Sequence, residues 1–136
     1  MMVQIVPLQY ANQTWPSVAE FIKAAIEQQT GDKDYTLEQV QVYVSSGQWA
    51  LLVATKDKKI IGAATVNLFN RPNHRVAFIT YIGGRLIVGK ESFEQMCQVL
   101  KSLGATSIEG AVNDAIARLW QRFGFVEKYK IVEVAL

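Results

Sequence analysis

The chain has 136 residues, a length typical of a single domain. Half of its residues are apolar and 19% are charged, which excludes an intrinsically disordered chain. Fourteen basic and twelve acidic residues give a formal net charge of +2, too small to indicate nucleic acid binding. No apolar run approaches the ~18 residues that span a bilayer, and Met1–Leu8 lacks a secretory-signal pattern. We expect a cytoplasmic protein that binds neither nucleic acid nor membrane.

The chain has one cysteine and one histidine, too few for a Cys- or His-rich metal site or a disulfide. Cys97 is the single cysteine, which excludes an intrachain disulfide and a Cys-rich zinc site. It falls at an apolar position of a predicted helix, where a thiol is buried and inert. His74 is the single histidine and lies in a predicted loop. We therefore expect no metal.

The first part of the chain predicts one strand and two helices. Val3–Leu8 is a short apolar run suited to a strand. Thr14 is expected to cap a helix that carries Pro16 in its first turn. Thr36 and Gln39 have the spacing of a capping box, in which a hydroxyl and an amide satisfy each other's backbone donors, so a second helix begins there.

The middle of the chain predicts an antiparallel meander. Three β-rich runs, Trp49–Thr55, Ile60–Phe69 and Arg75–Ile82, are separated by two short turn-like links. The first link, at 56–59, is charged, and the second, at 70–74, contains a proline. Sequential strands joined by short links pair antiparallel.

The last part of the chain alternates helices and strands. Phe93–Leu103 and Ala115–Phe123 have helical spacing, while Ser107–Val112 reads as a strand and Phe125–Leu136 as one or two more. Two strands of one sheet that are joined through a helix form a right-handed crossover and run parallel. We therefore expect Arg75–Ile82 and Ser107–Val112 to be the parallel pair of the sheet. We predict one α/β domain, 1–136, with a mixed sheet covered by helices.

The segment from Asn113 to Phe125 carries a family resemblance. It resembles the stretch of the GNAT N-acetyltransferase superfamily in which an asparagine precedes a short helix and a Gly-Phe pair, with Asn113, Leu119, Gly124 and Phe125 in register. The resemblance implies the GNAT fold, a mostly antiparallel sheet with a parallel βαβ crossover and helices on both faces. It also implies acetyl-CoA as the cofactor.

In the family, a glycine-rich loop before the central helix binds the pyrophosphate of CoA through backbone N–H groups. This chain has Gly83, Gly84, Arg85, Gly89 and Lys90 in that region, without the family's spacing. Glycines and two cations near a helix start are compatible with anion binding, so the resemblance makes these residues candidate cofactor ligands. Two structural alternatives stay open: the glycines form a bulge or a tight turn, and the cations are solvated.

Three further residues are cofactor candidates by the same resemblance. Ile82 ends the strand along which the pantetheine arm would lie, and Asn113 follows the other strand of the opening. Trp120 replaces a tyrosine that protonates the departing thiolate in many members. An indole N–H cannot transfer that proton, so Trp120 is expected to wall the cleft or to pack in the helix interface.

The candidate catalytic residues are Glu109 and Tyr81. Glu109, on a predicted strand, could act as a base through water, and Tyr81 could orient the acceptor or bond the thiolate. The alternatives are an exposed carboxylate and a half-buried aromatic side chain.

Two classes of function follow, and a regulatory sensor that binds CoA or another anion without turnover is a third possibility. The first is an N-acyltransferase that moves an acetyl group from acetyl-CoA to an unidentified amine. The second is a catalytically degenerate GNAT-fold protein with a binding or structural role. The segment Gly83–Phe125 is also similar to small GNAT-like proteins of tailed bacteriophages, some of them virion-associated. That similarity implies a protein partner in a phage particle or a homo-oligomer, and a virion location as the alternative to the cytoplasm.

Overall fold

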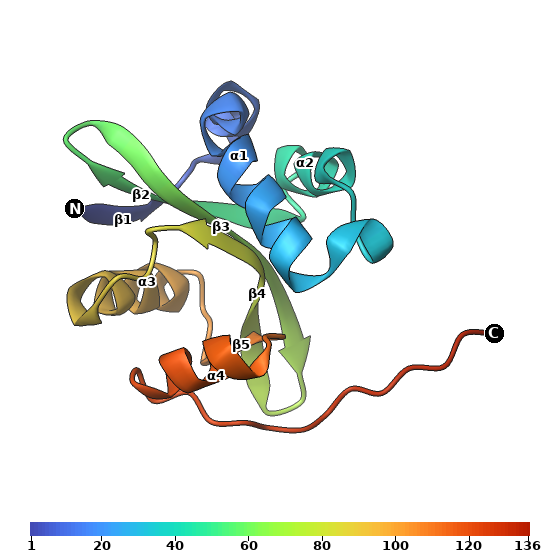
Figure 1. Ribbon diagram of the computed structural model, residues 1–136. Coiled ribbons are helices and arrows are strands. Elements are labelled where there is room, and N and C mark those ends of the chain that lie inside the picture. Colours follow the sequence, from blue (N-terminus) through green and yellow to red (C-terminus); the bar gives the residue numbers. More distant parts are fainter.

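The computed structural model describes all residues, 1–136. A single sheet separates two pairs of helices (Figure 1). None of the helices is long and apolar enough to cross a bilayer. In chain order the elements are β1 (Met2–Ile5), the short turn Leu8–Tyr10, α1 (Ala11–Gln29), the short turn Gly31–Lys33, α2 (Leu37–Ser45), β2 (Trp49–Lys56), β3 (Lys59–Arg71), β4 (His74–Gly84), α3 (Lys90–Ser102), β5 (Ser107–Gly110) and α4 (Asp114–Gln121).

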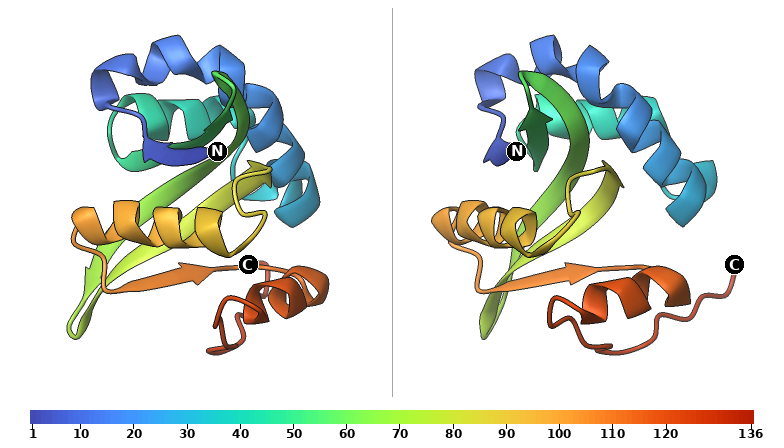
Figure 2. Two further views of the ribbon diagram at one scale, coloured as in Figure 1. Left: turned by 90° about the vertical axis from the view of Figure 1, so that its left-hand side faces the viewer. Right: turned by 60° about the vertical axis from the view of Figure 1, so that its left-hand side comes forward.

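The five strands lie in the order β1-β2-β3-β4-β5. The first three neighbouring pairs are antiparallel, and β4 and β5, joined by α3, are parallel. The predicted meander and the predicted parallel crossover are both confirmed. So is the fold class, a mixed sheet with helices on both faces (Figure 2).

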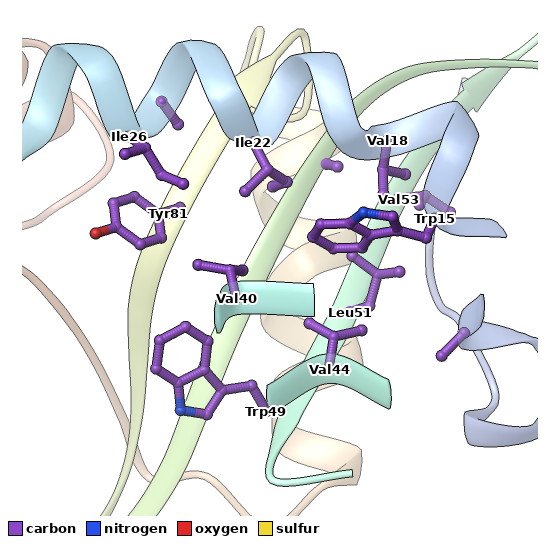
Figure 3. Close-up of a cluster of buried hydrophobic side chains, with 13 residues drawn as sticks. Trp15, Val18, Ile22, Ile26, Val40, Val44, Trp49, Leu51, Val53 and Tyr81 are labelled. Carbon is purple, nitrogen blue, oxygen red and sulfur yellow. The ribbon is translucent and has the colours of Figure 1, made fainter. Parts of the chain in front are cut away.

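The sheet divides the hydrophobic core into two clusters. One contains 13 buried residues and joins α1 and α2 to the sheet, with Trp15, Ile22 and Trp49 among its larger members (Figure 3). The other contains 11 buried residues on the opposite face, including Met96 and Trp120 from α3 and α4. Each face therefore has its own apolar core, as expected for a sheet covered on both sides.

Local sequence signals explain several boundaries. Thr36 accepts a hydrogen bond from the backbone N–H of Gln39, whose side chain bonds back to the N–H of Thr36, so the predicted capping box is confirmed. Asp57 and Lys58 form the two-residue turn between β2 and β3 with φ of 52° and 65°. Both residues have the left-handed conformation that tight hairpins need.

Two expectations were wrong. α1 begins at Ala11 and not after Thr14, because the turn before it winds directly into the helix and Ala11 is itself buried. The proline at 16 therefore lies inside the helix. The strands expected over Phe125–Leu136 are absent: residues 126–136 belong to no strand and make no backbone hydrogen bond. A β-rich segment becomes a strand only where it finds a pairing edge.

The backbone of α1 lies directly on that of β4, and glycines permit this approach. A Cβ added at Gly83 would lie 2.3 Å from the carbonyl oxygen of Phe21. One added at Gly84, whose φ is +68°, would lie 2.5 Å from the carbonyl oxygen of Ile61. Both contacts are with backbone atoms, which cannot rotate away. The two glycines are therefore required for packing.

We predict that Gly83→Ser destabilises the protein by about 2–3 kcal/mol, because the added side chain forces α1 away from β4. Gly89→Ser is the matched control, because a Cβ there meets nothing within 4 Å and the position is a helix N-cap, where serine is favoured. Urea unfolding of the three proteins measures the difference. Equal free energies of unfolding for the two variants would contradict the packing role.

Candidate functional site

β4 and β5 pair over part of their length and then separate. Val76–Ile79 pair with Ser107–Gly110, and β4 continues to Gly84 without β5 beside it. The two strands diverge in both views of Figure 2, where β4 is yellow-green and β5 is orange. From Thr80 onward, the edge of β4 that faces away from β3 therefore has no neighbouring strand.

A β-bulge lies where the strands separate. Thr65 pairs with Tyr81 and Val66 with Ile79, so Thr80 is an extra residue in β4. The Thr65 and Thr80 hydroxyls are 2.6 Å apart, and the Thr80 hydroxyl also lies 2.9 Å from the Thr65 carbonyl oxygen, to which it donates. A bulge bends its strand and increases the local twist, so Thr80 directs β4 away from β5.

The side chain of Gln29 occupies the free edge of β4. Its Nε2 donates to the Thr80 carbonyl over 3.5 Å, and its Oε1 accepts from the Ile82 N–H over 3.4 Å. One carboxamide thus takes the place of the N–H and C=O groups that a residue of a neighbouring strand would supply. Both bonds are long, and hydrogen bonds of this length are weak. Another amide could therefore displace Gln29.

Tyr81 lies on the face of the sheet covered by α1 and α2. Its side chain is 1% exposed, and its hydroxyl is 2.7 Å from that of Thr30, just after α1 (Figure 3). Burial raises the pKa of Tyr81, and the carboxylates of Asp34 and Asp32 contribute to the same shift. The hydroxyl is thus protonated at neutral pH.

The N-terminus of α3 has some N–H groups engaged and some free. The Ser92 hydroxyl accepts from the N–H groups of Val88 (3.0 Å) and Gly89 (3.3 Å). The first helical bond runs from Phe93 N–H to the Gly89 carbonyl. The N–H groups of the first helical turn, beginning at Lys90, precede that bond and have no helical partner, as at any helix start. They point toward the end where the helix dipole favours an anion.

Two cations flank this helix start. The Lys90 side chain is 88% exposed, with only a loose 3.9 Å contact to Glu94. Arg85 is exposed, although its backbone N–H is fixed to the Ile61 carbonyl at 2.8 Å. Exposed cations on a fixed backbone are available to a bound phosphate.

Asn113 and Trp120 have structural partners. The Asn113 side chain caps α4 by accepting from the Ile116 N–H at 2.9 Å. Trp120 is 5% exposed, contacts the Phe125 ring at 4.8 Å, and lies so close to Gly110 that a Cβ there would be 2.9 Å from the indole. These contacts favour helix capping and packing over cofactor contact.

Glu109 lies in an ion-pair network. Its carboxylate bonds to the Arg71 guanidinium and, at 3.0 Å, to the Lys128 ammonium, and its side chain is 16% exposed. The hydrogen bond from Arg71 is the main reason that the pKa of Glu109 is lowered. A carboxylate with a lowered pKa and two cationic partners is a weak base, which favours a structural role.

The structure thus separates the predicted site residues into two groups. One group lies along the free edge of β4 and the start of α3; its members are Tyr81, Ile82, Gly83, Gly84, Arg85, Gly89 and Lys90. The other consists of Glu109, Asn113 and Trp120, each held by its own contacts. Sequence reasoning missed Gln29 and Thr80, because only folding brings them together at this edge.

Two surface hollows lie elsewhere, along β1. One of about 390 Å³ is lined by Tyr10, Thr14 and Ile60, among others. One of about 370 Å³ includes Leu8 and Trp49. Neither contains a predicted site residue, so the candidate site rests on the open strand edge.

The sequence matches no protein-family model, and no curated protein sequence matches it significantly. Several solved structures, in contrast, have a similar fold. An aminoglycoside acetyltransferase from an uncultured soil metagenomic sample, in complex with sisomicin, superposes with a TM-score of 0.69 and 13% identity over 98% of this chain and 93% of that one. The chain has a GNAT-like fold.

Two further acetyltransferases have similar structures. An aminoglycoside N-acetyltransferase in complex with CoA has a TM-score of 0.67 and 14% identity over 98% of this chain and 93% of that chain. A ribosomal-protein-alanine N-acetyltransferase from Brucella melitensis biovar Abortus 2308 has a TM-score of 0.64 and 11% identity over the whole of both chains. At sequence identities this low, the similarity to these acetyltransferases is a similarity of fold alone.

We predict that Glu109 stabilises the fold in a pH-dependent way. Its pKa is lowered from 4.5, so the ionised form stabilises the protein above that pH, and this contribution is lost as the pH falls through the folded pKa. Glu109→Gln should lower Tm by about 2–5 °C at pH 7. The difference from the unsubstituted protein should shrink progressively as the pH falls below 4.5. A Tm difference that does not shrink with falling pH would contradict the ion-pair role.

Proposed function

We propose that the chain is an acyl-CoA-dependent N-acyltransferase whose thioester ligand lies along the free edge of β4. One observation carries this proposal: a carboxamide, that of Gln29, already bonds the Thr80 carbonyl and the Ile82 N–H. The pantetheine arm of CoA contains two amide groups, each with a donor and an acceptor. Such an arm can replace Gln29, with one amide N–H donating to the Thr80 carbonyl and the Ile82 N–H left free for the thioester carbonyl.

The start of α3 would receive the pyrophosphate. The free N–H groups of its first turn and the positive end of its dipole favour an anion, and Arg85 and Lys90 add two charges. Gly84 is followed within five residues by Gly89, so the strand edge and the helix start are adjacent in the chain. A ligand with an amide arm and a phosphate end fits this order.

The reaction requires no covalent enzyme intermediate. The amine nitrogen attacks the thioester carbon, the C–S bond breaks, and CoA leaves as a thiolate that water can protonate. The Ile82 N–H, once free of Gln29, can donate to the developing oxyanion. The amine proton passes to water, because no side chain here is placed as a base. Positioning and this one donor would supply the catalysis.

The acceptor would approach over the loop between α1 and α2, which follows Gln29 and contains the exposed Asp32 and Asp34. The pKa of the nearby Tyr81 is raised mainly by burial, and these two carboxylates add to the rise. Negative charge at the rim of a site attracts a cationic substrate. We therefore propose an acceptor amine on a positively charged molecule.

A second candidate function is ligand or partner binding without turnover. It is favoured by the contacts of the expected catalytic groups: Glu109 is ion-paired, Tyr81 is buried, and Trp120 packs on Gly110. In that case the fold would hold CoA as a sensor, or would serve a structural partner, of which a phage particle is one type.

We predict that the purified protein binds acetyl-CoA with micromolar affinity in isothermal titration. Gln29→Ala should tighten binding about two- to tenfold, because no internal bonds have to break first. Gln28→Ala is the matched control, since Gln28 is the exposed neighbour in α1 and makes no bond to β4. Arg85→Ala should weaken binding.

The outcomes separate the candidates. No binding of acetyl-CoA or CoA at millimolar concentration, by protein shown to be folded, would contradict both the transferase and the sensor. Binding without acetylation across a panel of amines would favour the second candidate. Unchanged affinity in Gln29→Ala would contradict the position of the ligand on β4.

We predict that Asp34→Asn raises KM for a polycationic amine several-fold and leaves the affinity for acetyl-CoA unchanged, because one attractive charge at the rim is removed. Asp57→Asn in the β2–β3 turn is the control, because it removes the same charge far along the chain from this loop. Steady-state acetylation at low and moderate salt measures the effect, which should shrink as salt rises. Equal KM in both variants would contradict the proposed acceptor side.

A further inference from the structure

The hollow of about 370 Å³ lies at the sheet edge where β1 ends. Ile5, the last residue of β1, pairs with Leu52, whereas β2 begins earlier, at Trp49. The edge of β2 before Leu52 therefore has no strand beside it, and the residues of this edge line the hollow. The volume is within the range of about 300–1,000 Å³ that small-molecule sites occupy.

The lining of this hollow is apolar and comes from both faces of the sheet. Ten of its 13 lining residues are hydrophobic. Val44 and Trp49 belong to the core cluster under α1 and α2, while Leu68 and Leu103 pack against the other cluster. Leu8 adds an apolar side chain that is 56% exposed. A hollow that passes around a strand edge from one face to the other is elongated, so an unbranched chain fits it better than a compact ring.

Arg75 is the only charged residue that lines the hollow. Its guanidinium is held in place, because Nε donates to the Leu103 carbonyl at 3.2 Å and one terminal nitrogen donates to Asn70 Oδ1 at 3.1 Å. Both acceptors are neutral, and Arg75 forms no ion pair. A guanidinium has five N–H donors, so this half-buried cation retains donors for an anion. A fixed guanidinium without a counter-ion is suited to a carboxylate.

We propose that this hollow binds an unbranched aliphatic carboxylate. The carboxylate pairs with Arg75, and the chain lies along the apolar lining. Each half of the ligand thus supplies what the hollow lacks: the anion gives Arg75 its counter-charge, and the chain covers exposed apolar surface such as Leu8. Because every buried methylene group adds to affinity, longer chains should bind more tightly until the hollow is filled.

This inference is independent of the proposed function. The hollow contains no residue from the free edge of β4 or from the start of α3. An acid bound here would leave the proposed CoA site open, and loss of either site would leave the other intact.

Isothermal titration with sodium octanoate at neutral pH tests the site. Octanoate should bind in the micromolar to submillimolar range and several-fold more tightly than hexanoate. Acetate lacks the chain and octylamine carries the opposite charge, so neither should bind measurably. Arg75→Gln should weaken octanoate binding at least tenfold. Arg85→Gln is the matched control, since it removes the same charge at the proposed CoA site and should leave the affinity for octanoate unchanged.

A second pair of variants tests the apolar half and does not alter the bonds of Arg75. Leu8→Asp places a negative charge in the lining at an exposed position and should weaken octanoate binding at least tenfold. Val42→Asp is its control, because this valine is 61% exposed on α2 and does not line the hollow. Circular dichroism checks that all four variants are folded.

Three results would overturn the proposal. The first is no binding of octanoate at millimolar concentration by the folded protein. The second is equal binding of octanoate and octylamine, which would show apolar adsorption without a carboxylate site. The third is an equal loss of affinity in Arg75→Gln and Arg85→Gln, or in Leu8→Asp and Val42→Asp, which would place the acid elsewhere.

Discussion

The direct contact between the backbones of α1 and β4 is the constraint on which the rest of the molecule depends. Gly83 has no room for a Cβ because the Phe21 carbonyl occupies that space. Helices normally rest on sheets through layers of side chains, at a larger separation. Here the closer approach carries the end of α1 to the edge of β4, and so brings Gln29 to Thr80 and Thr30 to Tyr81. A packing requirement thus determines the geometry of the candidate site.

The open edge of β4 is a compromise between stability and access. A strand edge exposed to water invites unwanted pairing, and proteins usually cover it. The bulge at Thr80 opens the edge, and the single carboxamide of Gln29 covers it weakly. Because the cover is one side chain rather than a strand, its removal requires a rotamer change and no unfolding. The edge is thus covered by two long hydrogen bonds from one side chain.

Periodicity and local signals predicted the order of elements, because strands 49–56 and 59–71 and the capping box at Thr36 depend on neighbouring residues. The site was predicted in part. Gly83 and Gly84 were predicted to bind phosphate or to form a bulge or a tight turn. A Cβ at Gly83 would meet the backbone of α1, some sixty residues earlier, and one at Gly84 would meet the backbone of β3. Glu109 gained its partners from Arg71 and Lys128 only on folding. Long-range contacts of this kind leave no local pattern in a sequence.

The division of the core by the sheet also gives the protein two separate optical reporters. Trp15 and Trp49 lie in the cluster under α1 and α2, where Trp49 stacks on Tyr43 at 4.6 Å. Trp120 is the one tryptophan of the other cluster and lies beside Gly110 at the end of β5. Fluorescence from a chain that retains only Trp120 therefore reports on the half of the molecule where β4 and β5 part. Emission from the other two indoles reports on the helical layer next to Tyr81, so loosening of either face can be followed without the other.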